Sequence, residues 1–145
     1  MGKRALKDIP LREITLRKYE EPANLEQREL TKKFLLSVGL LQPGESRDII
    51  VDIFHSMVLA RKEQKHLTMD LFLEKLKDKP GASAPNIRRQ LRRLRELKMI
   101  EKNQEGFRIA EFGSLCPIVD QFIIQYFVNP SLERIKQYAK ALDEI

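Results

Sequence analysis

The segment from Ser83 to Leu97 is the part of the sequence that most limits how this chain can fold. Its apolar residues recur at helical spacing, and at 100° per residue Leu91 and Leu94 fall within about 40° of Ile87. Arginine dominates the opposite side. A helix of this kind can bury only one side. The pattern therefore predicts a surface helix that packs on a small helical core and turns its charge outward.

Turn and capping residues divide the rest of the chain into short elements. Asn24, Ser46, Thr68 and Ser83 or Ala84 are the predicted helix starts, and Gly39 is a predicted helix end. A hairpin is predicted from two short strands, Met99–Lys102 and Phe107–Ile109, on either side of the turn 103–106, and two further helices follow Pro117 and Asn129-Pro130. The expected fold class is mostly α, with a short β-hairpin.

Positive charge is concentrated in one place. The chain of 145 residues has a net charge of +6, and seven basic and two acidic residues between Ala84 and Lys102 supply +5 of it. A basic total alone is weak evidence for a polyanionic partner, but charge gathered on one helix is stronger evidence. Nucleic acid is the expected partner.

Several classes of protein are not expected. Cys116 is the only cysteine, so no disulfide can form within the chain. The N-terminus lacks the apolar core of a secretory signal, and the most apolar stretch, 116–128, is interrupted by polar residues, so a cytoplasmic protein with no membrane contact is expected. His55, His66 and Cys116 do not have metal-site spacing. We also predict no enzyme, no cofactor and no small-molecule ligand, because no catalytic constellation stands out.

The stretch from about Ser46 to Gly113 resembles winged helix-turn-helix transcription regulators. Two stretches carry the resemblance. In Arg93–Lys102, a basic and apolar helix runs into a strand with the pattern apolar-isoleucine-glutamate-lysine. In Gly106–Gly113, a glycine turn leads into a strand with the pattern aromatic-arginine-apolar. Two departures are Lys98, where relatives often carry glycine, and Ala110, where a threonine often caps the next helix. The whole chain also resembles an archaeal family of uncharacterised regulators, from which no residue roles are taken.

The resemblance implies a sequence-specific binder of double-stranded DNA and a transcription regulator, with a recognition helix at about 84–97 and a wing at 99–109. The first half of such a helix reaches deepest into the major groove, so the residues expected at base edges are Asn86, Arg89 and Arg93. Those expected at phosphates are Arg88, Arg92 and Arg95. On the hairpin, Lys102 and Arg108 would contact the flanking backbone. A basic N-terminal arm of Lys3, Arg4 and Lys7 could add to this surface.

We expect three parts: an N-terminal arm and helix at 1–44, a DNA-binding domain at 45–113 and C-terminal helices at 114–145. The helix around Ile118–Phe127 is apolar on more than one narrow face, which favours a homodimer seam. The alternative is that it packs on the N-terminal helix near Phe34. A symmetric dimer would meet half-sites about 34 Å apart.

Three other interpretations stay open from sequence. The arginine surface could bind RNA, or the domain could serve only as a protein-interaction module in a larger assembly. The surface could also be an ordinary solvated face in which Glu96 pairs with Arg92 or Arg93. Against the last, two acids cannot neutralise seven bases.

Overall fold

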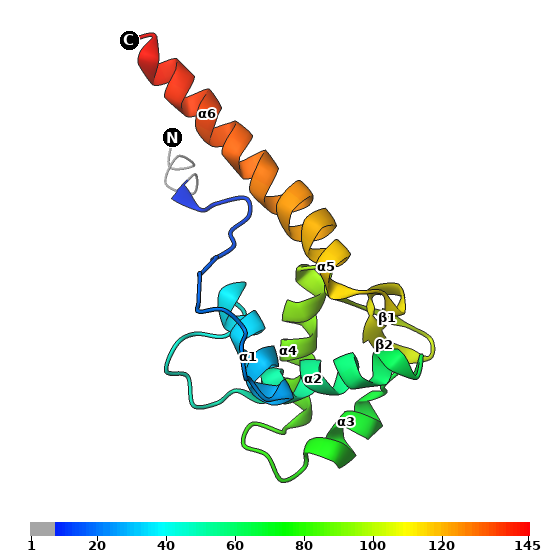
Figure 1. Cartoon of the computed structure of the whole chain (residues 1–145). Helices are drawn as coiled ribbons and strands as arrows, with labels where there is room; N and C mark the ends of the chain where they lie inside the picture. The colour runs from blue at the N-terminus through cyan, green and yellow to red at the C-terminus, as the bar shows by residue number, and fades with distance from the viewer. Residues whose placement is uncertain (1–7) are drawn as a thin grey trace.

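The computed structural model describes residues 8–145, so the predicted basic arm at Lys3, Arg4 and Lys7 lies outside the described residues. The chain is mostly helical, with one small antiparallel sheet, and a long C-terminal helix projects from the packed part (Figure 1). The elements in order are α1 (Gln27–Ser37), α2 (Ile49–Lys62), α3 (Met69–Leu76), α4 (Ala84–Glu96), β1 (Ile100–Asn103), β2 (Gly106–Ile109), the 3₁₀ turn η2 (Ala110–Phe112), α5 (Leu115–Ile118), the π-helical segment η3 (Val119–Val128) and α6 (Asn129–Asp143).

Two of the predicted helix starts are confirmed. The Thr68 hydroxyl accepts a hydrogen bond from the Leu71 N–H at 3.2 Å, and the Ser83 hydroxyl accepts one from the Asn86 N–H at 3.3 Å. These bonds satisfy N–H groups that have no partner within the first helical turn. Pro85 also lies in the first turn of α4, where its missing N–H costs nothing.

The other two predicted starts are wrong. Helix α1 begins at Gln27 rather than after Asn24, whose φ of +59° is left-handed and so unlike the extended backbone of an N-cap. Helix α2 begins at Ile49 rather than after Ser46, with Asp48 at its N-cap position. The Asp48 carboxylate makes no capping bond, because it pairs with Arg28 at 3.2 Å and Lys32 at 3.6 Å.

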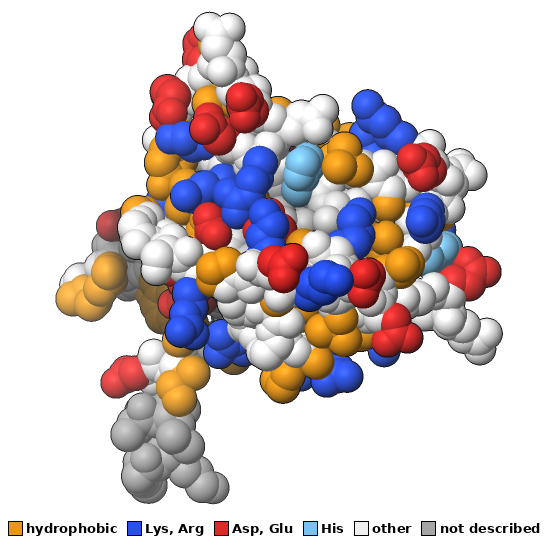
Figure 2. Space-filling model, turned by 90° about the horizontal axis from the view of Figure 1, so that it is seen from below, with side chains coloured by type: hydrophobic (Ala, Val, Ile, Leu, Met, Phe, Trp, Pro, Cys, Tyr) orange, Lys and Arg blue, Asp and Glu red, His pale blue; other side chains and the backbone are white. Residues whose placement is uncertain are grey.

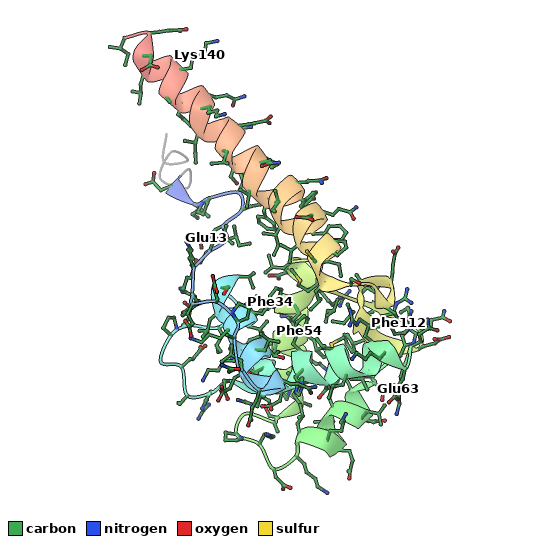
Figure 3. The ribbon with its side chains drawn as sticks, viewed as in Figure 1. Glu13, Phe34, Phe54, Glu63, Phe112 and Lys140 are labelled. Atoms are coloured by element: carbon green, nitrogen blue, oxygen red, sulfur yellow. The ribbon has the colours of Figure 1, made fainter. Side chains whose placement is uncertain are left out.

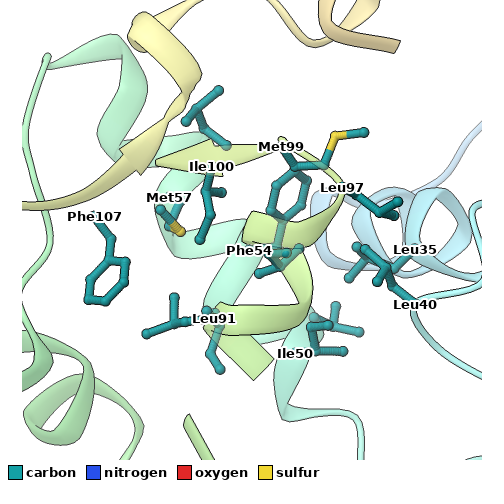
Figure 4. Packing of buried hydrophobic residues seen from close by; sticks show 14 of the residues in the cluster. Leu35, Leu40, Ile50, Phe54, Met57, Leu91, Leu97, Met99, Ile100 and Phe107 are labelled. Atoms are coloured by element: carbon teal, nitrogen blue, oxygen red, sulfur yellow. The ribbon is translucent and has the colours of Figure 1, made fainter. Parts of the chain in front are cut away.

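One continuous apolar core joins α1, α2, α3, α4 and the sheet (Figure 4). Phe54 of α2, Phe72 of α3 and Leu94 of α4 are almost completely buried in it. Phe34 of α1 stacks on Phe54 with ring centroids 5.8 Å apart (Figure 3). Helix α4 therefore packs its inner side on α2, α3 and β1, while its outer side stays exposed.

An ion cluster joins the starts of α1 and α2 to the loop before α4. Asp52, which is buried, accepts two hydrogen bonds from the Arg28 guanidinium, at 2.9 and 3.0 Å, and lies 3.3 Å from Lys79. Burial by itself would raise the pKa of Asp52, but the hydrogen bonds and charge of Arg28, together with Lys79, outweigh it and hold that pKa below its ordinary value. The same hydrogen bonds raise the pKa of Arg28.

The predicted hairpin is confirmed as β1 and β2, and a third segment extends it. Leu67 and Phe107 exchange two backbone hydrogen bonds of 2.9 Å each, so the chain between α2 and α3 lies along β2. Gly106 is required at this crossing. Its φ is +132°, and an added Cβ would lie 2.8 Å from the Leu67 carbonyl oxygen.

The C-terminal part differs from the prediction of two helices broken at Asn129-Pro130. Segments α5, η3 and α6 follow one another without a break and form one long rod (Figure 1). Pro130 lies in the first turn of α6, just after the π-helical segment, and the Ser131 hydroxyl donates to the Phe127 carbonyl at 2.7 Å. The wider π turn and this side-chain bond accommodate a proline that would otherwise interrupt the helix.

Candidate nucleic-acid interface

Four arginines on the outer side of α4 form an exposed surface, which we call the arginine face: Arg88, Arg89, Arg92 and Arg95. Among the described residues, no carboxylate lies within 4.0 Å of any of these guanidinium groups. Glu96, on the same side of the helix, is also exposed and pairs with none of them. The charge of this face is thus not cancelled by close partners.

The first turn of α4 holds Arg89 in place. Asn86 donates from its amide nitrogen to the Gly81 carbonyl at 2.8 Å, and its amide oxygen accepts from Arg89 at 3.0 Å and from Gln90 at 3.1 Å. Asn86 therefore uses both ends of its side chain within the protein. Its contacts suit a support for Arg89 better than a base-reading side chain.

Arg93 was expected on the exposed ridge, and this expectation is wrong. Its guanidinium is half-buried and donates to the Leu40 carbonyl at 2.7 Å and to the Gln90 side-chain oxygen at 2.8 Å. Leu40 follows the end of α1, where Gly39, with φ of +78°, turns the chain towards α4. Arg93 thus joins α4 to α1 and is committed to the fold.

The two predicted hairpin residues differ in the same way. Lys102 is exposed on β1, and its ammonium lies 5.5 Å from the centre of the Phe107 ring. Arg108 is half-buried, 3.3 Å from a Glu101 carboxylate oxygen though without hydrogen-bond geometry, and its guanidinium lies 4.8 Å above the Phe112 ring. Lys102 is free to meet a ligand, whereas Arg108 stabilises the base of the hairpin.

Lys98 was not among the predicted site residues, and it is one of the two positions where the sequence departs from the pattern that it resembles. Its φ is +62°, and the N–H groups of Lys98 and Met99 bond the carbonyls of Arg95, at 2.9 Å, and Leu94, at 3.2 Å. This is the Schellman ending of a helix, whose left-handed residue is usually glycine. Lysine in this conformation costs about 1 kcal/mol. The departure noted in the sequence could have identified this position.

Shallow hollows lie on both sides of α4. The hollow towards β1 has a volume of about 480 Å³, and its lining is mainly basic, with Arg92, Arg95, Glu96, Lys98, Ile100, Glu101 and Lys102. The hollow at the start of α4, about 490 Å³, adds one exposed arginine outside the predicted set, Arg47, beside Arg89 and Arg93. The basic surface therefore extends from the helix onto its neighbours.

The surface seen from the side of α3 has a different character. There, Lys and Arg are interspersed with Asp and Glu (Figure 2). Such mixing neutralises charge over short distances. It contrasts with the unpaired guanidinium groups of the arginine face.

Comparison with known proteins gives no relative: no family model, no curated protein and no solved structure matches this chain. None of the helices in residues 8–145 is both long enough and apolar enough to cross a membrane. Over the same residues, no three His, Cys, Asp or Glu side chains gather as metal ligands would.

Proposed function

We propose that this chain is a winged-helix protein that binds double-stranded DNA and regulates transcription. Helix α4 would enter the major groove, and the hairpin β1–β2 would lie on the flanking backbone. The order α2, α3, α4, hairpin supports the winged-helix assignment. So does the pairing of Leu67 with Phe107, which adds a third segment to the wing.

The observation that carries the proposal is the row formed by Arg88, Arg92 and Arg95. These side chains are exposed, spaced by four and three residues along one helix, and without an acidic partner among the described residues. Helix α4 buries its opposite side in the core, so these unpaired guanidinium groups lie on a well-supported helix. They suit the phosphates that border a groove, because each guanidinium can bond two phosphate oxygens at once.

The contacts inside the protein sort the side chains by role. Arg89, held by Asn86 in the first half of α4, is the candidate for base edges. Arg88, Arg92 and Arg95 would bind phosphates, and Lys98 and Lys102 would bind the next stretch of backbone in the hollow beside β1. Arg93 and Arg108 act as supports.

A salt titration of binding to a random-sequence duplex tests the proposal. Each phosphate contact contributes about 0.9 to the slope of log affinity against log salt, so Arg88→Ala and Arg92→Ala should each lower the slope by about that amount. Arg134→Ala is the matched control, because Arg134 is exposed on α6 and its removal changes the net charge equally. Equal slopes for all three variants would contradict the proposed surface.

Two further measurements refine the result. Competition at fixed salt should favour B-form DNA over an A-form RNA duplex, whose major groove is too narrow for a helix. Selection of bound sites from random duplexes should give a sequence preference that Arg89→Ala weakens at one base pair, by about 1–3 kcal/mol. Preference for RNA would instead support the RNA-binding interpretation.

A further inference from the structure

Helix α6 has no buried residue, although its sequence is strongly amphipathic. Leu132, Ile135, Tyr138 and Leu142 are 49, 60, 69 and 67% exposed, and Ile145, just beyond the helix, is fully exposed. Figure 3 shows the side chains of this helix, Lys140 among them, extending into open space away from the packed part. A large apolar surface of this kind marks an interaction site.

The exposed apolar residues share one face of α6. At 100° per residue, Leu132, Ile135, Tyr138, Ala139 and Leu142 fall within about 60° of a common direction. The spacing of Leu132, Ile135, Ala139 and Leu142 is three, four and three residues, as in the seam of paired helices. Charged residues occupy the opposite side, including Glu133, Lys136, Lys140 and Glu144. We call the apolar side the α6 stripe.

Nothing in the described chain covers the α6 stripe. Among the described residues before α1, Arg12 contacts the rod at a point before α6: it donates to the Tyr126 hydroxyl at 2.9 Å and lies 4.3 Å from the centre of its ring. A 15-residue helix without tertiary contacts is marginal in water, since helices in proteins are stabilised mostly by packing. We therefore expect the α6 stripe to pack against a partner molecule.

We propose that the partner is a second copy of this chain, whose α6 packs antiparallel on the first. The sequence is self-complementary about Gln137: in this arrangement Leu132 faces Leu142 of the other copy, and Ile135 faces Ala139. The two central layers of the seam then each pair a large side chain with a small one, and a Leu–Leu layer lies on either side of them, which favours close packing. A parallel pair would instead place the two Ala139 side chains together and leave a gap.

The available area suits a dimer of modest affinity. Burying one large apolar side chain removes roughly 60–120 Å² from water, so the four large residues of the stripe on each copy supply about 480–960 Å² in total. Polar neighbours add to this and bring the interface to the lower end of the range for specific complexes, about 1,200 Å². The seam predicted at Ile118–Phe127 is less suitable, because Ile118 and Ile123 are buried within the same chain.

Sedimentation equilibrium of the full chain, without DNA, tests the dimer. The wild type should dimerise at micromolar concentration, and Ile135→Glu should weaken dimerisation by about tenfold or more, because a charge enters the seam. Gln137→Glu is the matched control, since it adds the same charge to the polar side. A wild type that stays monomeric, or equal effects of the two variants, would overturn the proposal, as would a monomer that floats with anionic phospholipid vesicles.

Cysteine cross-linking tests the orientation, in a Cys116→Ser background because Cys116 is exposed. An antiparallel pair should cross-link Ile135→Cys with Ala139→Cys in an equimolar mixture, while neither variant cross-links alone, because a disulfide needs Cα atoms within about 7 Å. Cross-linking of Ala139→Cys with itself would contradict the antiparallel arrangement. Arg88→Ala and Arg92→Ala should leave dimerisation unchanged, so the dimer and the DNA-binding proposals can fail separately.

Discussion

Helices α4 and α6 have similar lengths, 13 and 15 residues, and both are amphipathic, yet the fold uses them in opposite ways. Helix α4 buries its apolar side in its own chain and presents charge. Helix α6 leaves its apolar side exposed, and no segment within residues 8–145 packs on that side. Amphipathicity thus identifies a helix with one face to bury but does not say whether its cover comes from the same chain. In this protein, that difference separates a candidate ligand surface from a candidate assembly surface.

The largest expected difference between α4 and α6 is the loss of stability when an apolar side chain is shortened. Leu91→Ala in α4 should lower the free energy of unfolding by about 2–5 kcal/mol, because Leu91 is almost completely buried. Leu132→Ala in α6 should change it by less than about 0.5 kcal/mol, measured by urea unfolding at a concentration where the chain is monomeric. Similar losses for the two variants would mean that α6 packs on its own chain after all.

The ion cluster of Arg28, Asp52 and Lys79 is a second difference between the two helices. It joins α1 and α2 to the loop before α4, whereas α6 has no ion pair among the described residues. Arg28→Ala should destabilise the fold by about 2–3 kcal/mol, since it leaves Asp52 buried with Lys79 as its remaining partner. Because the folded-state pKa of Asp52 is lowered, its contribution is complete above the unfolded value of about 3.9 and is lost as the pH falls below it. Urea titrations between neutral and acid pH should show a smaller acid-dependent loss for Arg28→Ala than for Arg134→Ala.

A third prediction separates the two kinds of arginine within α4. Arg93→Ala should cost about 1–2 kcal/mol of stability, because it removes the hydrogen bonds to Leu40 and Gln90. Arg88→Ala should cost less than about 0.5 kcal/mol and act on DNA binding alone. Thermal or urea unfolding measured beside DNA affinity checks both. A destabilised Arg88→Ala would contradict the view that this side chain is free.

The smallest expected effect is at Lys98. Lys98→Gly should raise stability by about 0.5–1 kcal/mol, because glycine adopts the left-handed conformation without steric cost, and it should weaken DNA binding by removing a charge. Lys98→Ala is the control, since it removes the charge but keeps the strain. If Lys98→Gly binds DNA as well as the wild type, this lysine has no part in the interface.

The features predictable from sequence were those set by local chemistry. The caps at Thr68 and Ser83, the helix end at Gly39 and the turn of the hairpin all depend on residues within one helical turn of each other. The apolar spacing also placed Ile87, Leu91 and Leu94 in the core. These contacts need no knowledge of distant segments.

The errors concern partners that are distant in sequence. Helix geometry put Arg93 on the exposed ridge, but the carbonyl that captures it belongs to Leu40, 53 residues earlier. The Asp48 carboxylate is taken by the side chains of α1, and the break expected at Pro130 is absent because a π-helical segment precedes it. At the candidate site, the sequence alone located the cluster of basic residues. It could not show which of these arginines hydrogen-bond within the fold and which stay exposed.

The uninterrupted passage from η3 into α6 has a mechanical consequence. The helical backbone is uninterrupted from η3 to the far end of α6, so this part of the rod would act as a rigid spacer, and α6 alone contributes about 22 Å at 1.5 Å per residue. Two copies paired side by side along α6 would hold their arginine faces at one fixed separation and one fixed rotation. Adding or deleting a single residue in the rod would turn each arginine face by about 100° about its own rod, so the length of the rod sets which spacings of target sites the pair can span.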